Sequence, residues 1–150
     1  KFPAKERFYA DLTAYLGNTF TDKDRVIVMG DMNVAAADID VGIKPENAKR
    51  WLKTGKSAFL PEEREWLQTM QGWGLTDSYR SMNPQDDRSY SWFDYRSRGF
   101  EQDPQSGLRI DLILASDPAM SDLVGTGIDF DARAFEKPSD HCPIWADFKL

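Results

Sequence analysis

Three short groups of polar residues in this sequence carry side chains that could bind a metal ion or transfer a proton. The groups are Asp31 with Asn33, Asp111, and Asp140 with His141, the single histidine of the chain. Carboxylate and amide oxygens suit a hard cation such as Mg²⁺, which takes oxygen ligands and keeps several of its waters. If the fold gathers these residues from separate strands, they could hold a cation together with the phosphate of a substrate.

Each group also has a structural interpretation that the sequence leaves open. Asp31 follows Gly30 after an apolar run, which is typical of a turn whose carboxylate bonds the nearby backbone. Asp111 lies within an apolar strand pattern, where a buried carboxylate needs either a structural partner or a function. His141 could be a satisfied loop histidine, or Asp111 could accept a bond from one ring nitrogen while the other faces a phosphate.

Two further segments could contact a nucleic acid. Residues 44–64 hold six basic and three acidic side chains, so this stretch is positive within a chain whose formal net charge is −6. It could follow a phosphate backbone, or it could be an ordinary solvated helix face. The candidates are the basic residues Lys49, Arg50 and Lys56 and the loop residues Trp92, Phe93 and Arg96. Rings and guanidinium groups can stack on bases or enter a groove, although some of the rings could instead pack in the core.

Composition and charge restrict the class of protein. With 150 residues, 41% of them hydrophobic, the chain fits one ordinary domain with a real core, and disorder is not expected. The negative net charge excludes a bulk polycation but not a nuclease with acidic metal ligands. Cys142 is the only cysteine, so we expect no internal disulfide and a reducing, cytoplasmic setting. With no recognisable signal peptide and no apolar run near the roughly 20 residues of a membrane helix, we expect a soluble protein without a membrane partner.

Apolar spacing predicts two amphipathic helices and several strands. Helical spacing is found in 3–16, where Phe8, Leu12, Tyr15 and Leu16 share a face, and in 61–73, which begins with Pro61. Strand patterns are found at 26–29, 90–95, 109–115, 128–134 and 142–148. We expect 26–29 to be buried on both faces, and 35–59 to be a long irregular connection with one helical turn near 46–52.

The polar groups occur within longer motifs that follow one another in a recognisable order. The motifs are Gly30-Asp31-Met32-Asn33, Ser91-Trp92-Phe93-Asp94-Tyr95-Arg96, Leu108-Arg109-Ile110-Asp111-Leu112 and Ser139-Asp140-His141. In this order they resemble the endonuclease/exonuclease/phosphatase superfamily along the whole chain. Lys49-Arg50-Trp51-Leu52, Thr54-Gly55-Lys56 and the segment 59–66 resemble its bacterial exonuclease III branch, within the abasic-site endonucleases, rather than the animal-type branch.

The resemblance implies Mg²⁺-dependent hydrolysis of phosphodiester bonds in double-stranded DNA, with Mn²⁺ as an alternative ion. The implied activities are 3′-to-5′ exonuclease, abasic-site endonuclease and 3′-phosphatase in base excision repair, at abasic sites or 3′ ends. By the family pattern, Asp31 would orient or deprotonate the attacking water, and Asn33 would bond the scissile phosphate. Asp111 would orient His141, which would contact the same phosphate. Asp140 would support the metal, with Asp31 and Asn33 beside it, and Trp92, Phe93 and Arg96 would lie at the DNA surface.

The resemblance also implies a fold of which this chain is one part. The family fold is a DNase I-like, four-layer α/β sandwich, in which each half of the chain contributes one mostly antiparallel sheet flanked by helices. Residues 1–150 look like the C-terminal half, because the Asn, metal-binding Glu and Tyr motifs of the N-terminal half are missing. We therefore expect an incomplete domain with little nuclease activity alone and with exposed apolar surface. The full-length family protein is expected to be a monomer.

Two other functions stay open at this point. Another phosphatase or nuclease of the superfamily would share the Asp-x-Asn and Ser-Asp-His elements, since these identify the reaction more than the substrate. A non-catalytic DNA-binding module would need only the basic stretch and the aromatic loop. Turnover of abasic duplex, single strand, RNA and phosphoinositide separates the first alternative, and DNA binding that survives loss of Asp31 and Asp111 would indicate the second.

Overall fold

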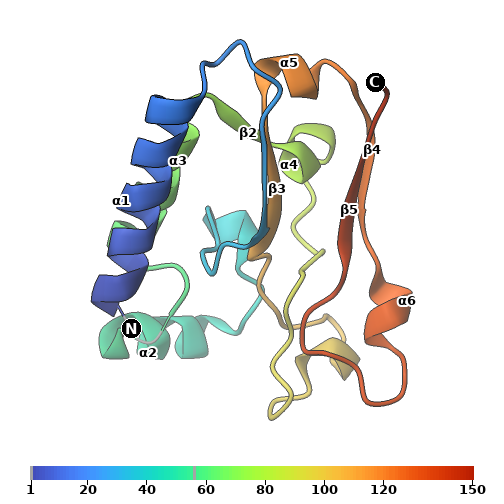
Figure 1. The fold of residues 1–150 in the computed structure, drawn as a ribbon. Coiled ribbons are helices and arrows are strands. Elements are labelled where there is room, and N and C mark those ends of the chain that lie inside the picture. Colours follow the sequence, from blue (N-terminus) through green and yellow to red (C-terminus); the bar gives the residue numbers. More distant parts are fainter. Residues whose placement is uncertain (1, 56) are drawn as a thin grey trace.

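A computed structural model of the protein describes residues 2–55 and 57–150 (Figure 1). The helices are α1 (Phe2–Thr19), α2 (Pro45–Thr54), α3 (Pro61–Gln71), α4 (Ser78–Met82), α5 (Asp117–Met120) and α6 (Phe130–Arg133), with 3-10 turns at Asp38–Asp40 and Gly99–Glu101. The strands are β1 (Ile27–Asp31), β2 (Leu75–Asp77), β3 (Asp111–Ser116), β4 (Leu123–Ile128) and β5 (Ile144–Phe148). The expected α/β class is confirmed. Within these described residues, no helix has the length and apolar character that crossing a membrane requires.

The strands pair in an antiparallel manner. β3 lies between β1 and β2 in a three-stranded sheet, and β4 pairs with β5 in a second, two-stranded sheet. In the β1–β3 register, Asp31 lies directly opposite Asp111. Residues opposite one another in such a pair have neighbouring side chains, so the sheet brings together two carboxylates that lie far apart in the sequence.

The main core lies between the three-stranded sheet and helices α1 and α3, which pack against each other on one face of this sheet (Figure 1). Its buried members include Tyr9, Leu16, Val34, Leu67, Met70, Leu112 and Leu114. The β4–β5 pair lies on the other side of β3, and β5 contacts β3 there (Figure 1). β3 is therefore enclosed from both sides, and the residues after Asp111 on this strand are buried.

Helix α1 forms where helical spacing predicts it and buries part of the expected face. Phe8 and Tyr15 are 59% and 55% exposed, so the expected apolar face through these two residues is wrong. Leu16 is buried and Leu12 packs beside it, as expected, and Tyr9 is buried in addition. The Tyr9 hydroxyl donates a hydrogen bond to the Met32 carbonyl, a contact that apolar spacing cannot reveal.

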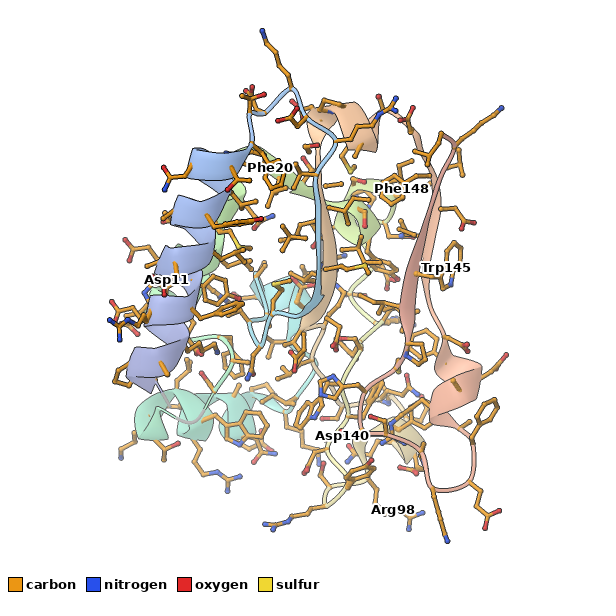
Figure 2. All side chains as sticks on the ribbon, viewed as in Figure 1. Asp11, Phe20, Arg98, Asp140, Trp145 and Phe148 are labelled. Carbon is orange, nitrogen blue, oxygen red and sulfur yellow. The ribbon has the colours of Figure 1, made fainter. Side chains whose placement is uncertain are left out.

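Strand β1 is an edge strand with one covered face, so the expectation that 26–29 is buried on both faces is wrong. Ile27 and Met29 are 45% and 70% exposed, whereas Val28 packs against the core. Val124 and Trp145 in the β4–β5 pair are also exposed, and Trp145 is labelled in Figure 2. The part of the chain that the structure describes thus exposes several large apolar side chains.

Three other segments differ from the sequence-based expectation. In the described chain, 90–95 forms no strand, and Trp92 makes only isolated bridges there. The expected strand 128–134 is wrong for its larger part, because β4 ends at Ile128 and α6 follows. The Asp129 carboxylate starts this helix by accepting a hydrogen bond from the Ala132 N–H. The connection 35–59 contains the whole ten-residue helix α2 rather than a single turn.

Candidate functional site

The site begins at the turn that follows β1, residues 30–33, which we call the Asp31 corner. Gly30 (φ 141°) and Asn33 (φ 52°) have positive backbone angles that redirect the chain around Asp31. The Asn33 N–H donates a 2.8 Å hydrogen bond to Asp31 Oδ1. This is the turn that the structural interpretation of Gly30-Asp31 predicts. The bond occupies one carboxylate oxygen, so the turn is compatible with a functional role for the other.

Asp111 and His141 complete the group. His141 Nδ1 lies 3.1 Å from Oδ1 and 2.9 Å from Oδ2 of Asp111, and His141 Nε2 lies 3.8 Å from Asp31 Oδ2. One ring nitrogen therefore bonds a carboxylate while the other faces the Asp31 corner, which is the arrangement that the functional interpretation of His141 requires. One ligand atom from each of the three side chains lies within 4.8 Å of the others. We call Asp31, Asp111 and His141 the site cluster.

The buried residue Ser91 connects the segment of Asp111 with the segment of His141 through hydrogen bonds. Ser91 Oγ accepts hydrogen bonds from the N–H groups of Ile110 and Asp111, each at 3.0 Å. The Ser91 carbonyl accepts a 2.7 Å bond from the N–H of Cys142, the residue after His141. In the sequence, Ser91 stands out only as one member of the 91–96 motif. No spacing rule could have singled it out, because its partners lie far along the chain.

Asp140 lies next to the site cluster and makes a different contact. The indole Nε1–H of Trp92 donates a 3.1 Å hydrogen bond to Asp140 Oδ2. Figure 2 shows Asp140 toward the end of the molecule where Arg98 projects, whereas Phe148 lies toward the other end. The bond from Trp92 occupies one oxygen and orients the carboxylate, and the second oxygen keeps its capacity to accept. That Asp140 binds metal stays a prediction.

Burial and neighbouring charge change the acidity of the site cluster. Burial raises the pKa of Asp31, and the charge of Asp111 raises it further. The hydrogen bond to Asp111 raises the pKa of His141 above its ordinary value, against the opposing effect of burial. Asp31 is therefore a better proton acceptor than an ordinary carboxylate, and His141 carries a positive charge at higher pH than an ordinary histidine.

The donor set of the site cluster fits a divalent cation. Two carboxylates and an imidazole converge, and the Asp31 side chain is 45% exposed, so a partly hydrated ion has access. Burial raises the pKa of Asp31 most, repulsion from Asp111 raises it further, and a bound cation would relieve this repulsion. The described residues thus offer a place for a metal ion with mainly oxygen ligands.

An open pocket of about 380 Å³ lies in front of the site cluster. It is lined by Asp31, Asn33, Trp51, Ser57, Ala58, Trp92, Leu108, Ile110 and His141. Trp51 and Trp92 meet edge to face in its wall, with ring centroids 6.3 Å apart. Polar groups on one side and apolar groups on the other could hold a phosphate next to a sugar or base. Trp51, Leu108 and Ile110 are not recognisable as site residues from the sequence, because apolar residues in such patterns indicate core.

Most of the predicted DNA-contact residues are accessible. Trp92 lines the pocket, and Arg96 is exposed in the loop that follows it. Lys49 and Arg50 are exposed on α2, the helix that also supplies Trp51 to the pocket wall. The prediction for Lys56 concerns a position outside the described residues.

Phe93 corrects the sequence-based assignment of the aromatic loop. Its side chain is 0% exposed, and its ring packs edge to face against Tyr90 and Phe100, with centroid distances of 6.2 and 5.2 Å. The buried guanidinium of Arg133 lies 5.9 Å from the same ring. Phe93 is therefore a core residue that anchors the loop, and the expectation that it lies at the DNA surface is wrong.

A second group of charged residues, two aspartates and two arginines, lies next to the start of β3. Arg109, which is 1% exposed, places Nε 2.7 Å from Asp40 Oδ1 and a terminal nitrogen 2.5 Å from Asp77 Oδ2. Arg80 bonds the same oxygen of Asp40 at 2.5 Å. Burial opposes the charge of Arg109, but the bonds and charges of Asp77 and Asp40 outweigh it and raise the pKa of Arg109. We call Asp40, Asp77, Arg80 and Arg109 the buried ion network.

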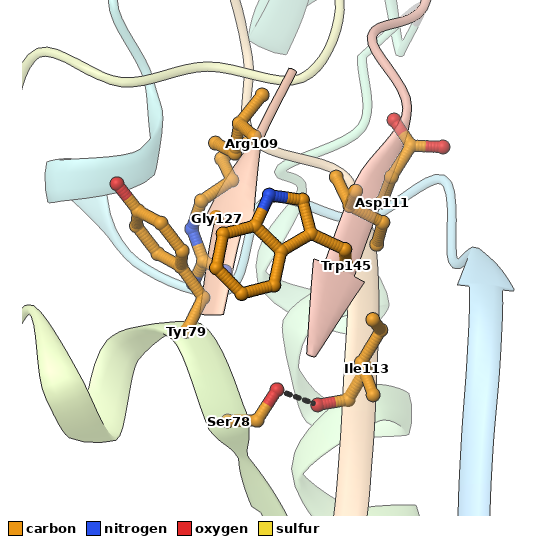
Figure 3. A pocket seen from close by; sticks show the side chains of 9 residues that line it. Ser78, Tyr79, Arg109, Asp111, Ile113, Gly127 and Trp145 are labelled. Atoms are coloured by element: carbon orange, nitrogen blue, oxygen red, sulfur yellow. Dashed lines mark hydrogen bonds between the residues drawn. The ribbon is translucent and has the colours of Figure 1, made fainter. Parts of the chain in front are cut away.

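A small cavity separates the buried ion network from the β4–β5 pair. It has a volume of about 10 Å³, and Tyr79, Arg109 and Trp145 help to line it (Figure 3). The Arg109 guanidinium lies over the Tyr79 ring, 5.2 Å from its centroid. Figure 3 shows the Asp111 carboxylate pointing away from this side. The cavity is too small for a substrate, so the open pocket is the candidate binding site.

Comparison with known proteins gives consistent matches. The model of the "Endonuclease/Exonuclease/phosphatase family" matches residues 1–141. "Exodeoxyribonuclease III" of Haemophilus influenzae is 55% identical over 149 residues, which cover 99% of this chain and 55% of that protein. An AP endonuclease structure from Archaeoglobus fulgidus superposes with a TM-score of 0.86 at 31% identity, over 99% of this chain and 55% of that one. The 3′-5′ exonuclease NExo from Neisseria meningitidis has a TM-score of 0.84 at 36% identity, with the same two coverages of 99% and 55%.

These matches agree with the geometry of the site. The chain spans 55% of the length of the Haemophilus relative. The family model extends over the Asp31 corner, β3 and the loop that carries His141. The sequence motifs, the antiparallel fold and the site cluster all support membership of the same family. The chain belongs to the endonuclease/exonuclease/phosphatase family.

Proposed function

We propose that the chain is part of a metal-dependent nuclease that hydrolyses phosphodiester bonds at 3′ ends and abasic sites of double-stranded DNA. The observation that carries the proposal is the site cluster, in which two carboxylates and an imidazole converge beside an open pocket. The relatives give further support: one is an exodeoxyribonuclease, one an AP endonuclease, and one a 3′ phosphatase from Neisseria bound to a product DNA hairpin. These names correspond to the three activities expected in base excision repair.

The residues of the site have distinct roles in this reaction. Asp31 orients the attacking water and accepts its proton, for which its raised pKa is favourable. Asn33 donates from its amide to the scissile phosphate at the pocket wall. His141 turns Nε2 toward the same phosphate and stabilises its developing negative charge. Asp111 holds the imidazole through Nδ1 and favours its charged form.

We assign Mg²⁺, with Mn²⁺ as an alternative, to this site. Asp31, Asn33 and Asp140 are the proposed ligands, while Asp111 and His141, which lie close to Asp31, keep their bond to each other. When bound, the ion would polarise the phosphate oxygens and stabilise negative charge on them. The oxygen-rich donor set supports a hard ion of this class over a softer one.

The substrate would enter through the open pocket. Trp92 lines this pocket, Arg96 is exposed in the same loop, and Lys49 with Arg50 provides positive charge on α2. Aromatic stacking with flanking cations is a common means of holding a DNA strand at a distorted position. Phe93 anchors this loop from the core rather than contacting DNA.

The part of the relatives that this chain does not span is expected to contribute to nuclease activity. The chain spans 55% of the Haemophilus relative, and the family resemblance places further catalytic groups in the half of the fold that 1–150 lacks. We infer that the 150-residue chain alone has little or no nuclease activity, that the full-length protein is a monomer, and that it works in the cytoplasm. Burial raises the pKa of Cys142 to about 12, so this cysteine is an unreactive thiol in such a setting.

The test uses a chimera of full family length. Residues 1–150 replace the segment of the Haemophilus relative that they match, and the chimera is assayed with Mg²⁺ and with Mn²⁺. The substrates are a blunt duplex, an abasic duplex and a duplex with a 3′-phosphate. We expect turnover of all three and a loss of about a hundredfold on Asp31→Asn. Asp147→Asn, which alters an exposed carboxylate on β5, serves as the matched control and should keep full activity.

Other outcomes would favour the alternatives. A folded chimera that binds DNA in a salt-dependent manner but cleaves none of the substrates would indicate a DNA-binding module. Faster turnover of RNA or a phosphoinositide than of DNA would indicate another member of the superfamily. Strong Mg²⁺-dependent cleavage by the 150-residue chain alone would contradict the inference that it needs the remaining length.

A further inference from the structure

Two polar side chains of helix α1 reach the Asp31 corner from behind. Tyr9, Leu12 and Leu16 form the packed face of this helix, and Lys5 lies one turn before Tyr9 on the same face. Tyr9 is 3% exposed, and the Lys5 side chain is 18% exposed. An ammonium group and a hydroxyl are unfavourable to bury unless each bonds a specific partner. Their partners therefore indicate what they do.

The two side chains bond consecutive carbonyl groups of the corner. The Tyr9 hydroxyl donates to the Met32 carbonyl at 2.5 Å, and Lys5 Nζ donates to the Asn33 carbonyl. The Met32 N–H donates at 2.9 Å to the segment that leads into β3, and the Asn33 N–H donates to Asp31 Oδ1. All main-chain polar groups of the two residues after Asp31 are thus bonded, and α1 supplies half of those bonds.

Lys5 is held in place by a buried acid of α3. Its ammonium group forms an ion pair with Glu63, which is 1% exposed. The other carboxylate oxygen of Glu63 accepts a 3.1 Å hydrogen bond from the Leu60 N–H at the start of α3. The ammonium group therefore lies between a fixed carboxylate and the Asn33 carbonyl, and this one group connects α1, α3 and the corner.

The conformation of Asn33 explains why the corner needs these bonds. Its φ of 52° is in the left-handed region, which asparagine adopts more readily than most residues with a Cβ but which still costs free energy. Such a conformation persists at a functional site only where the surrounding bonds fix it. Asn33 lines the open pocket and Asp31 belongs to the site cluster, so relaxation of this turn would displace both side chains.

We propose that Lys5 and Tyr9 are positioning residues that fix the Asp31 corner for catalysis by bonding the carbonyl groups of Asn33 and Met32. The catalytic part of this inference rests on the proposed function. The structural part, that α1 sets the turn, rests on the contacts alone. An apolar pair could pack α1 against α3 equally well, so the bonds to the corner are what Lys5 and Glu63 add.

Charge-matched variants separate positioning from stability. Lys5→Met alone would leave Glu63 buried without its partner and could unfold the protein, so the informative variant is K5M/E63Q, which removes both charges. Glutamine keeps an oxygen that can accept from the Leu60 N–H. Tyr9→Phe removes only a hydroxyl. The controls are Arg7→Met and Tyr15→Phe, which change a basic residue and a tyrosine at exposed positions of the same helix.

The first readout is amide hydrogen exchange in the 150-residue chain, which needs no activity. We expect the Asn33 amide to exchange at least about tenfold faster in K5M/E63Q and in Y9F, because the turn that protects it opens more often. The Leu112 and Leu114 amides of β3 should be unchanged, and both controls should match the wild type. Equal exchange of Asn33 in all variants would overturn the proposal.

The second readout is turnover by the chimera of full family length. We expect kcat to fall about tenfold in K5M/E63Q and in Y9F, with KM within about twofold, because the corner is misplaced while the binding pocket remains. Wild-type kcat in K5M/E63Q would overturn the positioning role. If the unmodified chimera is inactive, the proposed function fails, and the exchange of Asn33 still decides whether α1 fixes the corner.

Discussion

The site cluster and the buried ion network are built from similar groups but differ in how completely their charges are satisfied. Arg109 and Asp111 lie only two positions apart in one segment, but Arg109 bonds Asp40 and Asp77 whereas Asp111 bonds His141. In the buried ion network, Arg109 is almost fully buried and bonds both Asp40 and Asp77. In the site cluster, the Asp31 side chain is 45% exposed, and the imidazole of His141 lies 3.8 Å away.

This difference shows what makes a carboxylate available to a ligand. In the buried ion network, each acid bonds a guanidinium whose position is fixed, so the charges compensate one another within the protein. In the site cluster, two carboxylates share one imidazole, and the pKa of Asp31 is raised by burial and by Asp111. A cation or a proton would complete this arrangement from outside. The first group should therefore control stability and the second should control reactivity.

The largest expected effect is the loss of stability when the buried ion network is broken. Arg109→Met leaves Asp40 and Asp77 without their main partner, and should lower the free energy of unfolding by about 3–5 kcal/mol. Urea unfolding of the 150-residue chain measures this change. Arg96→Met, at an exposed position, is the control and should have almost no effect. A loss below about 1 kcal/mol for Arg109→Met would remove the distinction between the two groups.

The next effect is a loss of activity without a loss of stability. Asp111→Asn weakens the orientation and charge of His141, and should reduce turnover by the chimera about a hundredfold. The free energy of unfolding should change by no more than about 1 kcal/mol, because this carboxylate is satisfied by a single imidazole. A variant that unfolds like Arg109→Met, or that retains full turnover, would show that Asp111 is a structural acid.

A smaller effect is the pH dependence that His141 contributes to stability. The folded-state pKa of His141 is raised, so the folded protein binds this proton more tightly than the unfolded chain, whose histidine has a pKa near 6.5. The stabilisation is fully present below the unfolded pKa and is lost as pH rises through the folded pKa. The stability difference between wild type and His141→Gln should therefore be larger at about pH 5.5 than at about pH 9 in urea unfolding. In the Asp111→Asn background the pH dependence of this difference should largely disappear.

The smallest expected effect is a gain in stability from a substitution that lowers turnover. Asp31→Asn removes one of two facing carboxylates and should raise the free energy of unfolding by about 0.5 kcal/mol, a modest value because the side chain is half-exposed and screened. Thermal unfolding of the chain at neutral pH measures this change. A clear loss of stability would mean that the Asp31–Asn33 turn matters more to the fold than the repulsion between carboxylates.

The residues of the site cluster are largely predictable from the sequence. Polar residues that interrupt or end apolar runs are unusual, and Asp31, Asp111 and His141 were singled out for that reason. Their convergence depends on the β1–β3 register, which places Asp31 opposite Asp111, and on the loop that returns His141 to the same edge. The alternation in 109–115 predicted the strand, whereas periodicity alone could not specify its partner strands.

Contacts between distant polar side chains were not predictable. Arg109 and Asp40 are 69 positions apart, and an arginine in a strand motif does not indicate that it will be buried with two acids. The same holds for Ser91 Oγ below Asp111 and for Tyr9 behind the Asp31 corner. For Phe93, the sequence predicts a binding surface, whereas the structure shows a core position. An aromatic residue in a polar loop fits either environment, and only tertiary packing decides between them.

The most direct test of the central claim is the location of divalent cation binding in the 150-residue chain. Mn²⁺ added in small amounts to isotope-labelled protein broadens the NMR signals of nearby groups, and the single histidine provides an unambiguous ring signal. We predict selective broadening of the His141 ring and of the Asn33 and Asp111 amides, with the Arg80 and Phe148 amides unaffected. Broadening centred on other acidic residues, with the His141 ring unchanged, would contradict the claim that these groups form one metal-binding site.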